Sequence, residues 1–311
     1  MKSTYIKYAF GLLLLPLSIT TFSQEDGSKM SDVEEVIVVG SQIKGAKITG
    51  ALPVSIISSK DIEAIGVDSG DDLLENIAEQ GLNYFNEAED ASGGVNASRG
   101  DVGAYNLRSL GVGNTLTLLN GRRLVNSPGY QTELIGGDYV PTTSVNSNLI
   151  PVTGIDRLEI LRDGAAAQYG SDAIAGVINF VLNDASEGGS FEARYGSYYE
   201  GDGDMIQLSG NIGMPLSDKG FINLSAEYRT ADDTSRSVQR DDAAGLVAGG
   251  NTFVADPAQI WGSPEIKHDY KLFANLGLEL SDTAEAYMFG NFAEREVEGG
   301  FYYRNPHTRG G

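Results

Sequence analysis

The second half of the chain alternates apolar and polar residues with a period of two. This alternation is typical of β-strands that have one apolar and one polar face. Five stretches show it, at residues 191–195, 206–212, 222–229, 272–279 and 284–294. The segments between them are short or intermediate, except for residues 230–268, which form a very long connection. The pattern predicts five consecutive antiparallel strands within residues 186–311.

The predicted strands have about the length that a tilted strand needs to cross a membrane. An apolar outer face and a wet interior are typical of the wall of an outer-membrane barrel, and such barrels alternate short periplasmic turns with long outer loops. A soluble β-sandwich also alternates in this way. The strands alone therefore leave both architectures open.

Residues 51–185 combine strand and helix patterns. An apolar strand is expected at residues 52–57, and two short amphipathic helices are expected after Ser59 and Ser69, whose hydroxyls can cap helix N-termini. Asn120-Gly121 stands between two apolar-rich runs and predicts a tight hairpin. Two further strands are expected at residues 155–162 and 174–182, with surface loops at 81–101 and 127–143. These elements predict a small α+β domain.

The N-terminal 23 residues predict an export signal. Lys2 and Lys7 precede an apolar run of about ten residues, and small polar residues follow it, as in a secretory signal peptide. The run is too short to span a bilayer. Residues 24–50 are mostly polar but contain four consecutive β-branched residues, 36–39. These four are either the first strand of a domain or a tethered strand that pairs with the sheet edge of another protein.

Composition excludes several functional classes. The chain has 22 Lys+Arg against 43 Asp+Glu, a net charge of −21, which repels nucleic-acid backbones. It has no cysteine, and its histidines are only His268 and His307. No nucleophile elbow or metal-ligand spacing is present, so the sequence predicts no enzyme, no cofactor and no bound metal. The 40 glycines fit a chain with many turns and hairpins.

Several motifs resemble TonB-dependent outer-membrane receptors. The seven residues Glu34, Glu35, Val36, Ile37, Val38, Val39 and Gly40 resemble the TonB box, the segment through which these receptors bind TonB. The motifs that resemble the plug domain of the same family, in the family's order and spacing, are 106–108, 119–122, 155–162, 168–171 and 175–179. The resemblance covers residues 33–185, and the strand pattern continues it.

The resemblance implies an α+β plug domain followed by antiparallel transmembrane β-barrel strands. The expected organisation is a signal peptide (1–23), a periplasmic segment with the TonB box (24–50), the plug (51–185) and the N-terminal part of the barrel (186–311). Family barrels have about 22 strands, so five cannot close around a plug, and open edges are costly in a bilayer. The sequence is therefore expected to be a truncated part of a longer receptor.

The function implied by the resemblance is energised uptake of a scarce nutrient complex, in the first place a ferric siderophore. The implied partners are TonB with its inner-membrane proton-motive-force complex, outer-membrane lipid and the extracellular nutrient complex. The implied location is the outer membrane, with the plug and TonB box facing the periplasm. The alternatives are an importer of oligosaccharide, cobalamin or haem, and a passive porin-like barrel.

Two sets of residues are predicted sites. Loops at the plug apices are expected to touch the ligand, and the candidates there are Arg99, Gly113, Asn114, Tyr130 and Gln131. A plug inside a wet barrel needs its charges matched. Ion pairs between plug and barrel are therefore expected from Arg108, Arg157 and Arg162 to carboxylates such as Glu192 and Glu227.

Overall fold

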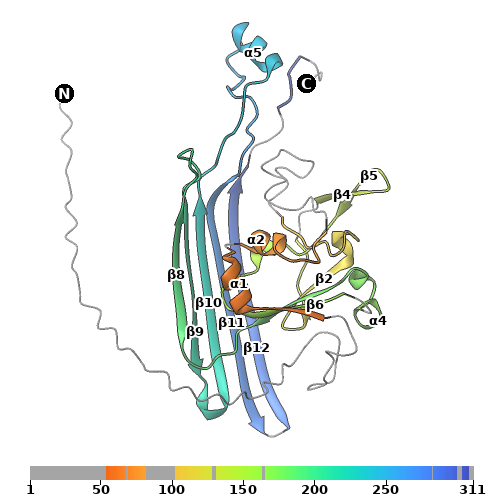
Figure 1. Cartoon of the computed structure of the whole chain (residues 1–311), viewed down its shortest axis with the longest axis vertical. Coiled ribbons are helices and arrows are strands. Elements are labelled where there is room, and N and C mark those ends of the chain that lie inside the picture. The colour runs from red at the N-terminus through yellow and green to blue at the C-terminus, as the bar shows by residue number, and fades with distance from the viewer. Residues whose placement is uncertain are drawn as a thin grey trace, which may run out of the picture. The chain divides into compact units, whose positions relative to one another are not determined.

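The computed structural model describes residues 54–67, 69–81, 102–127, 131–162, 165–281, 283–299 and 303–307. The predicted signal peptide, residues 1–23, and the predicted TonB box, residues 34–40, lie outside the described residues. The described part contains two five-stranded sheets and one two-stranded sheet (Figure 1).

The first sheet is the centre of the α+β domain. Its strands are β1 (Val54–Ser58), β6 (Ile155–Leu161), β7 (Gly176–Leu182), β2 (Thr115–Leu119) and β3 (Arg122–Arg123), in the order β1-β6-β7-β2-β3. β2 runs parallel to β7, and the other neighbours are antiparallel. The buried core includes Leu107, Leu158, Ile160, Ile178 and Phe180, all fully buried. β1 has no buried residue, which fits its position at the edge of the sheet.

Short helices flank this sheet. They are α1 (Ser59–Ile65), α2 (Gly70–Glu75) and α4 (Ala165–Tyr169), with single 3-10 turns η1 (Val112–Asn114), η2 (Ser147–Leu149) and η3 (Ser171–Ala173). Ser69 caps α2 as predicted. α1 begins one residue earlier than predicted, because Ser58 and not Ser59 is its N-cap. Ser58 forms a capping box with Asp61, and this reciprocal pair fixes the start of the helix.

The hairpin at Asn120-Gly121 is confirmed. Asn120 has φ +46° and Gly121 has φ +74°, the left-handed conformations that a type I′ turn requires. The loop expected at 127–143 is wrong in part, because the chain there forms the hairpin of β4 (Gln131–Ile135) and β5 (Asp138–Thr142). Gly136 and Gly137 supply the positive φ of its turn.

The second large sheet confirms the five predicted strands. Its strands are β8 (Gly189–Gly196), β9 (Met205–Pro215), β10 (Gly220–Ala231), β11 (Glu265–Ser281) and β12 (Ala284–Glu298), each antiparallel to the next (Figure 1). The long connection between β10 and β11 carries α5 (Asp241–Ala248), and a 3-10 turn, η4 (Ser217–Lys219), joins β9 to β10. The sheet is open, with β8 and β12 as its outer strands among the described residues. We refer to it as the wall.

Among the helices of the described residues, none combines the length and the apolar character needed to cross a membrane.

Candidate functional site

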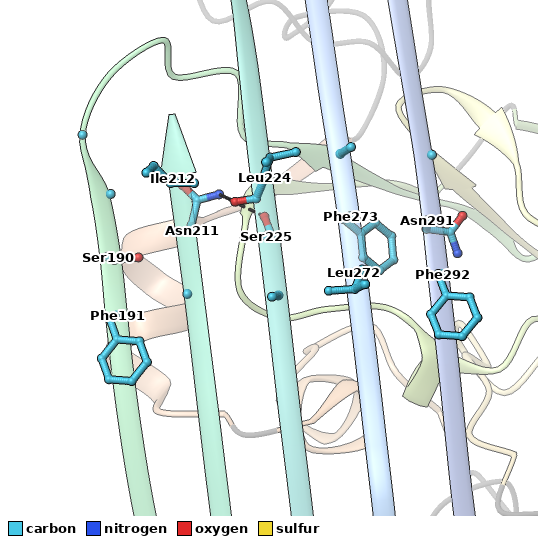
Figure 2. A pocket seen from close by; sticks show the side chains of 16 residues that line it. Ser190, Phe191, Asn211, Ile212, Leu224, Ser225, Leu272, Phe273, Asn291 and Phe292 are labelled. Atoms are coloured by element: carbon cyan, nitrogen blue, oxygen red, sulfur yellow. Dashed lines mark hydrogen bonds between the residues drawn. The ribbon is translucent and has the colours of Figure 1, made fainter. Parts of the chain in front are cut away.

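The outer face of the wall is apolar. Phe191, Leu272 and Phe292 are respectively 76%, 52% and 55% exposed although they are large apolar residues. With Ile212 and Leu224 they line a shallow groove of about 940 Å³ across the strands (Figure 2). An exposed apolar face of this extent is typical of strands whose outer side contacts lipid and not water.

The opposite face of the wall is polar and buried. Its side chains include Gln207, Ser209, Asn223, Ser225, Glu227, Asp269, Lys271 and Asn275, each at most 9% exposed. The α+β domain covers these residues, and the contacts described below join the two parts. Phe273 on this face is apolar: it is 5% exposed and belongs to the core cluster of the α+β domain, and the partly buried Phe289 packs against the same cluster. The predicted alternation is therefore confirmed, whereas an apolar anchor at Phe273 was not predicted.

A pair of asparagines joins the β2–β3 hairpin to the wall. Asn120 Nδ2 donates to Asn275 Oδ1 over 3.2 Å. Asn275 Nδ2 in turn donates to the carbonyl oxygens of Leu182 (3.4 Å) and Asn183 (3.0 Å). The Asn120 side chain also accepts a hydrogen bond from the Leu182 backbone nitrogen at 2.8 Å. The turn, the end of β7 and β11 are thus held by one set of amide groups.

A chain of buried charges meets the loop before β6. The backbone nitrogen of Thr153 donates to Glu227 Oε1 at 2.5 Å, and Lys271 Nζ lies 3.3 Å from Glu227 Oε2. Lys271 Nζ is also 3.4 Å from Asp269 Oδ2, which Arg295 Nη1 approaches to 2.8 Å. All four charged side chains are at most 4% exposed. Burial without such partners would cost each charge several kcal/mol.

A third contact ties α1 to β8. Arg194 Nη1 donates to the carbonyl oxygens of Gly66 (2.8 Å) and Val67 (3.0 Å), which follow the last residue of α1. Glu192 Oε1 accepts from Arg194 Nε at 2.6 Å and so orients the guanidinium. A cavity of about 430 Å³ lies next to this contact and is lined by both α1 and strands β8 and β9.

The predicted ion pairs between plug arginines and the wall differ from the contacts in the structure. Arg108 Nη2 donates to the carbonyl oxygens of Arg162 (2.7 Å) and Ala175 (2.9 Å). Within the described part of the chain, Glu192 contacts Arg194, and Glu227 contacts Lys271 and the backbone nitrogen of Thr153. The charges of the wall are matched by neighbouring strands and by plug backbone groups.

Arg157 and Arg162 have carboxylate partners inside the α+β domain. Arg157 Nη2 lies 2.9 Å from Glu159 Oε1, and Arg157 Nη1 lies 2.7 Å from Asp156 Oδ2. Burial acts to lower the pKa of Arg157, but these two carboxylates outweigh it and raise that pKa above its usual value. Arg162 Nη1 is 3.9 Å from Glu79 Oε1. Glu159, which is fully buried, also accepts from Asn179 Nδ2 at 3.0 Å.

Two of the predicted ligand residues lie in η1. These are Gly113 and Asn114, and the Asn114 amide donates to Leu110 O at 2.7 Å. η1 lies against the β4–β5 hairpin, because the backbone nitrogen of Val112 donates to Glu133 Oε1 at 3.3 Å. Gln131 begins that hairpin, so the structure brings two of the predicted loop regions together. Arg99 and Tyr130 lie outside the described residues, and the described histidine, aspartate and glutamate side chains form no cluster of three that could hold a metal.

Sequence reasoning missed the contacts among the long connections. Arg236 Nη1 lies 2.5 Å from Asp202 Oδ2, and its guanidinium stacks over the Tyr198 ring at 5.7 Å. The hydrogen bond with Arg236 lowers the pKa of Asp202. Arg240 lies over the Tyr303 ring at 5.6 Å. These pairs join connections that are far apart in sequence, and no local pattern marks them.

An α+β domain fastened to the polar face of an antiparallel sheet, whose other face is apolar, defines a plug and part of a barrel wall. Residues 46–177 match the family model described as the TonB-dependent receptor plug domain. This match, together with the relatives and solved structures described next, supports a TonB-dependent receptor.

Curated relatives and solved structures agree with this assignment. The chain is 27% identical over 232 residues to the vitamin B12 transporter BtuB of Photobacterium profundum, covering 75% of this chain and 33% of the relative. It is 25% identical over 227 residues to BtuB of Vibrio cholerae, covering 72% of this chain and 32% of the relative. The chain thus spans about a third of the length of these relatives.

Two solved receptors share the fold. A mutant of the ferric enterobactin receptor PfeA from Pseudomonas aeruginosa matches with a TM-score of 0.57 at 20% identity, covering 80% of this chain and 34% of that chain. The siderophore receptor PirA from Acinetobacter baumannii matches with a TM-score of 0.51 at 20% identity, covering 82% of this chain and 33% of that chain. At this identity the likeness concerns the fold.

Proposed function

We propose that the longer receptor to which this chain belongs imports a bulky nutrient complex across the outer membrane, using energy delivered through TonB. The observation that carries the proposal is the plug itself, which is fastened to the polar face of the wall by Asn120, Thr153 and the end of α1. A barrel that holds such a plug needs work to pass a large solute. We take the domain limits to be 24–50 for the periplasmic segment, 51–185 for the plug and 186–311 for this part of the barrel.

The energy is proposed to enter through residues 34–40. Val36, Ile37, Val38 and Val39 have strong extended propensity and would add as a strand to the sheet edge of TonB. Glu34 and Glu35 would set the register or complement the charge of that partner. The segment precedes β1, the edge strand of the plug sheet, so a pull on it reaches β1 first.

Deletion of residues 36–39 in the full-length receptor tests this mechanism. Uptake should fall to the level of a strain without TonB, while binding of the nutrient to whole cells stays intact. A matched control removes residues 27–30 from the neighbouring polar stretch and should leave uptake unchanged. Uptake that survives the deletion of 36–39 would contradict energised transport and favour a passive, porin-like barrel.

A ferric siderophore is the substrate that we propose. Support comes from the likeness of the fold to PfeA and PirA, which concerns architecture, and from apical loops that carry hydrogen-bonding groups. Contacts are proposed at Arg99, Gly113, Asn114, Tyr130 and Gln131, of which Gly113 and Asn114 form the turn beside the β4–β5 hairpin. Replacing Asn114 by Ala should weaken ligand binding at cell surfaces more than it changes the amount of receptor in the membrane.

Cobalamin is the second candidate, and a specific observation favours it. The curated relatives with 25–27% identity over more than 70% of this chain are vitamin B12 transporters. Binding of radiolabelled cobalamin and of a panel of ferric siderophores to cells that express the full-length receptor separates the two. Saturable binding of cobalamin alone would replace the siderophore in the proposal and leave TonB-dependent transport standing.

A further inference from the structure

β1 and α1 are much less buried than the central strands of the plug. No residue of β1 is buried, and Ile62 is the one buried side chain of α1. β1 pairs with β6 along one side and forms the edge of its sheet. By contrast, β6 and β7 are almost wholly buried. Displacement of β1 and α1 therefore exposes much less apolar surface than displacement of the central strands.

The wall beside α1 is separated from the plug by polar space. The cavity of about 430 Å³ is lined by Glu63 on α1, by Glu192 and Arg194 on β8, and by Gln207 and Ser209 on β9. Elsewhere along the wall, Phe273 joins the plug core and Asn275 hydrogen-bonds to the end of β7, next to a smaller cavity of about 290 Å³. The cavity would hold water molecules of about 30 Å³ each, but the passage of a bulky complex requires it to widen.

The geometry points to Arg194 as a latch, a side chain that holds the end of α1 against β8 and keeps this cavity from widening until β1 and α1 move. The plug then opens in the space between α1 and strands β8 and β9. The inference rests on the proposed function, because it identifies the part of the plug that moves first during the proposed TonB-dependent transport. Arg194 holds the C-terminal end of α1 through two carbonyl oxygens, and its partner Glu192 stands on the same strand. Moving α1 away breaks the bonds to Gly66 and Val67 and leaves the Arg194–Glu192 pair intact. The guanidinium then faces the widened, water-filled space with Glu192 still bound, which lowers the cost of opening.

Two serines of the wall distinguish this local opening from release of the whole plug. Ser209 lines the cavity and is 6% exposed, and Ser225 is 7% exposed beneath the loop that contains Gly154. The chain has no native cysteine, so Ser209→Cys and Ser225→Cys are nearly isosteric reporters. In the full-length receptor, with cysteines elsewhere replaced by serine, each is labelled in cells with a periplasm-permeant maleimide.

Labelling of Ser209→Cys should rise several-fold when ligand and TonB are both present, while labelling of Ser225→Cys stays low. Arg194→Ala should raise labelling of Ser209→Cys about tenfold without TonB, as expected for the loss of about one net hydrogen bond to a charged group. Arg194→Lys should have a smaller effect, and Arg236→Ala, on the connection above the wall, should have none. Outer-membrane levels and heat-modifiable migration of each variant show that the barrel is folded.

Equal rises at both serines would mean that the whole plug moves and would overturn the inference. In a receptor whose uptake depends on TonB, it would also be overturned if labelling of Ser209→Cys did not respond to TonB. In any receptor, labelling of Ser209→Cys that did not respond to Arg194→Ala would overturn it. The labelling of Ser209→Cys in the Arg194→Ala variant, measured in cells without TonB, does not depend on transport. A receptor that lacks TonB-dependent uptake but shows this response would contradict the proposed function and retain the latch.

Discussion

Gly154 of the plug lies so close to Ser225 of β10 that a Cβ atom on the glycine would stand 1.8 Å from the Ser225 Oγ. Gly154 also has φ +84°, and its carbonyl oxygen accepts a hydrogen bond from the backbone nitrogen of Asn183. The close approach places the loop before β6 directly on the wall, next to the contact between Thr153 and Glu227. A glycine is therefore required here for both its backbone conformation and its lack of a side chain.

Gly154→Ala should loosen the plug from the wall much more than Gly188→Ala does. The two glycines have nearly the same φ, +84° and +83°, but a Cβ at Gly188 meets no atom within 4 Å. Gly188→Ala should cost about 1–2 kcal/mol, the strain of a left-handed alanine. Gly154→Ala should cost at least about 3 kcal/mol, because it adds the clash with Ser225. Hydrogen exchange of β6 and β7 amides in the purified full-length receptor measures both, and the double variant with Ser225→Gly should recover the excess.

Asn275→Ala should weaken the attachment of the β2–β3 hairpin. The change removes the donor to the carbonyl oxygens of Leu182 and Asn183 and the acceptor for Asn120. Loss of a buried polar partner costs about 1–3 kcal/mol. The Leu182 amide, whose acceptor is Asn120 Oδ1, should exchange faster by a corresponding factor. Asn291→Ala on the neighbouring strand is the control, and equal exchange in the two variants would show that the asparagine pair does not hold the hairpin.

Glu159→Ala should be among the most destabilising single changes in the plug. Glu159 is fully buried and accepts from Asn179 Nδ2 and from Arg157. Removing one partner of a buried ion pair costs about 3–5 kcal/mol. Asp156 is the other carboxylate beside Arg157, and its side chain is 45% exposed. Asp156→Ala should therefore cost at most about 1 kcal/mol of stability. Resistance of the plug to proteolysis in the full-length receptor ranks the two variants, and a ranking in the opposite order would refute this account.

Local patterns predicted the elements of this fold better than the contacts between them. The type I′ turn at Asn120-Gly121 and the five wall strands depend on residues that are neighbours in sequence, so their signals are complete in short windows. The β4–β5 hairpin was missed because the residues on either side of Gly136-Gly137 do not alternate between apolar and polar with a period of two. Its identity as a hairpin depends on pairing that the residues of one strand do not reveal.

The plug–wall contacts were predicted as ion pairs from Arg108, Arg157 and Arg162 to carboxylates such as Glu192 and Glu227, because a plug in a wet barrel needs its charges matched. That need is met, but by a backbone nitrogen at Thr153 and backbone carbonyls at Gly66 and Val67, which carry no sequence signature. Phe273 illustrates the same limit, since one apolar residue on a polar face has meaning only once the plug core is seen against it. The sequence shows which groups need hydrogen-bonding or charged partners, and the tertiary fold determines which partners those groups find.

Acidification should loosen α1 through its capping box. Ser58 donates its hydroxyl and backbone nitrogen to Asp61 Oδ2 at 2.6 and 2.9 Å, and these bonds hold the pKa of Asp61 below its ordinary value of 3.8. Because the folded pKa is the lower one, the cap contributes fully above the unfolded pKa and is lost as the pH falls through the folded pKa. Exchange of α1 amides, compared with that of Asp61→Asn at each pH, should show protection by Asp61 at neutral pH that disappears in acid.

The same variant links the cap to the latch. If α1 is the element that moves away from the cavity, Asp61→Asn should raise labelling of Ser209→Cys at neutral pH, because a less stable helix leaves Arg194 more often. Asp72→Asn on α2 is a suitable control, since it removes an acidic residue from the first turn of a neighbouring helix and leaves α1 unchanged. A rise that is equal in both variants would show that general loosening of the plug, and not of α1, exposes the wall.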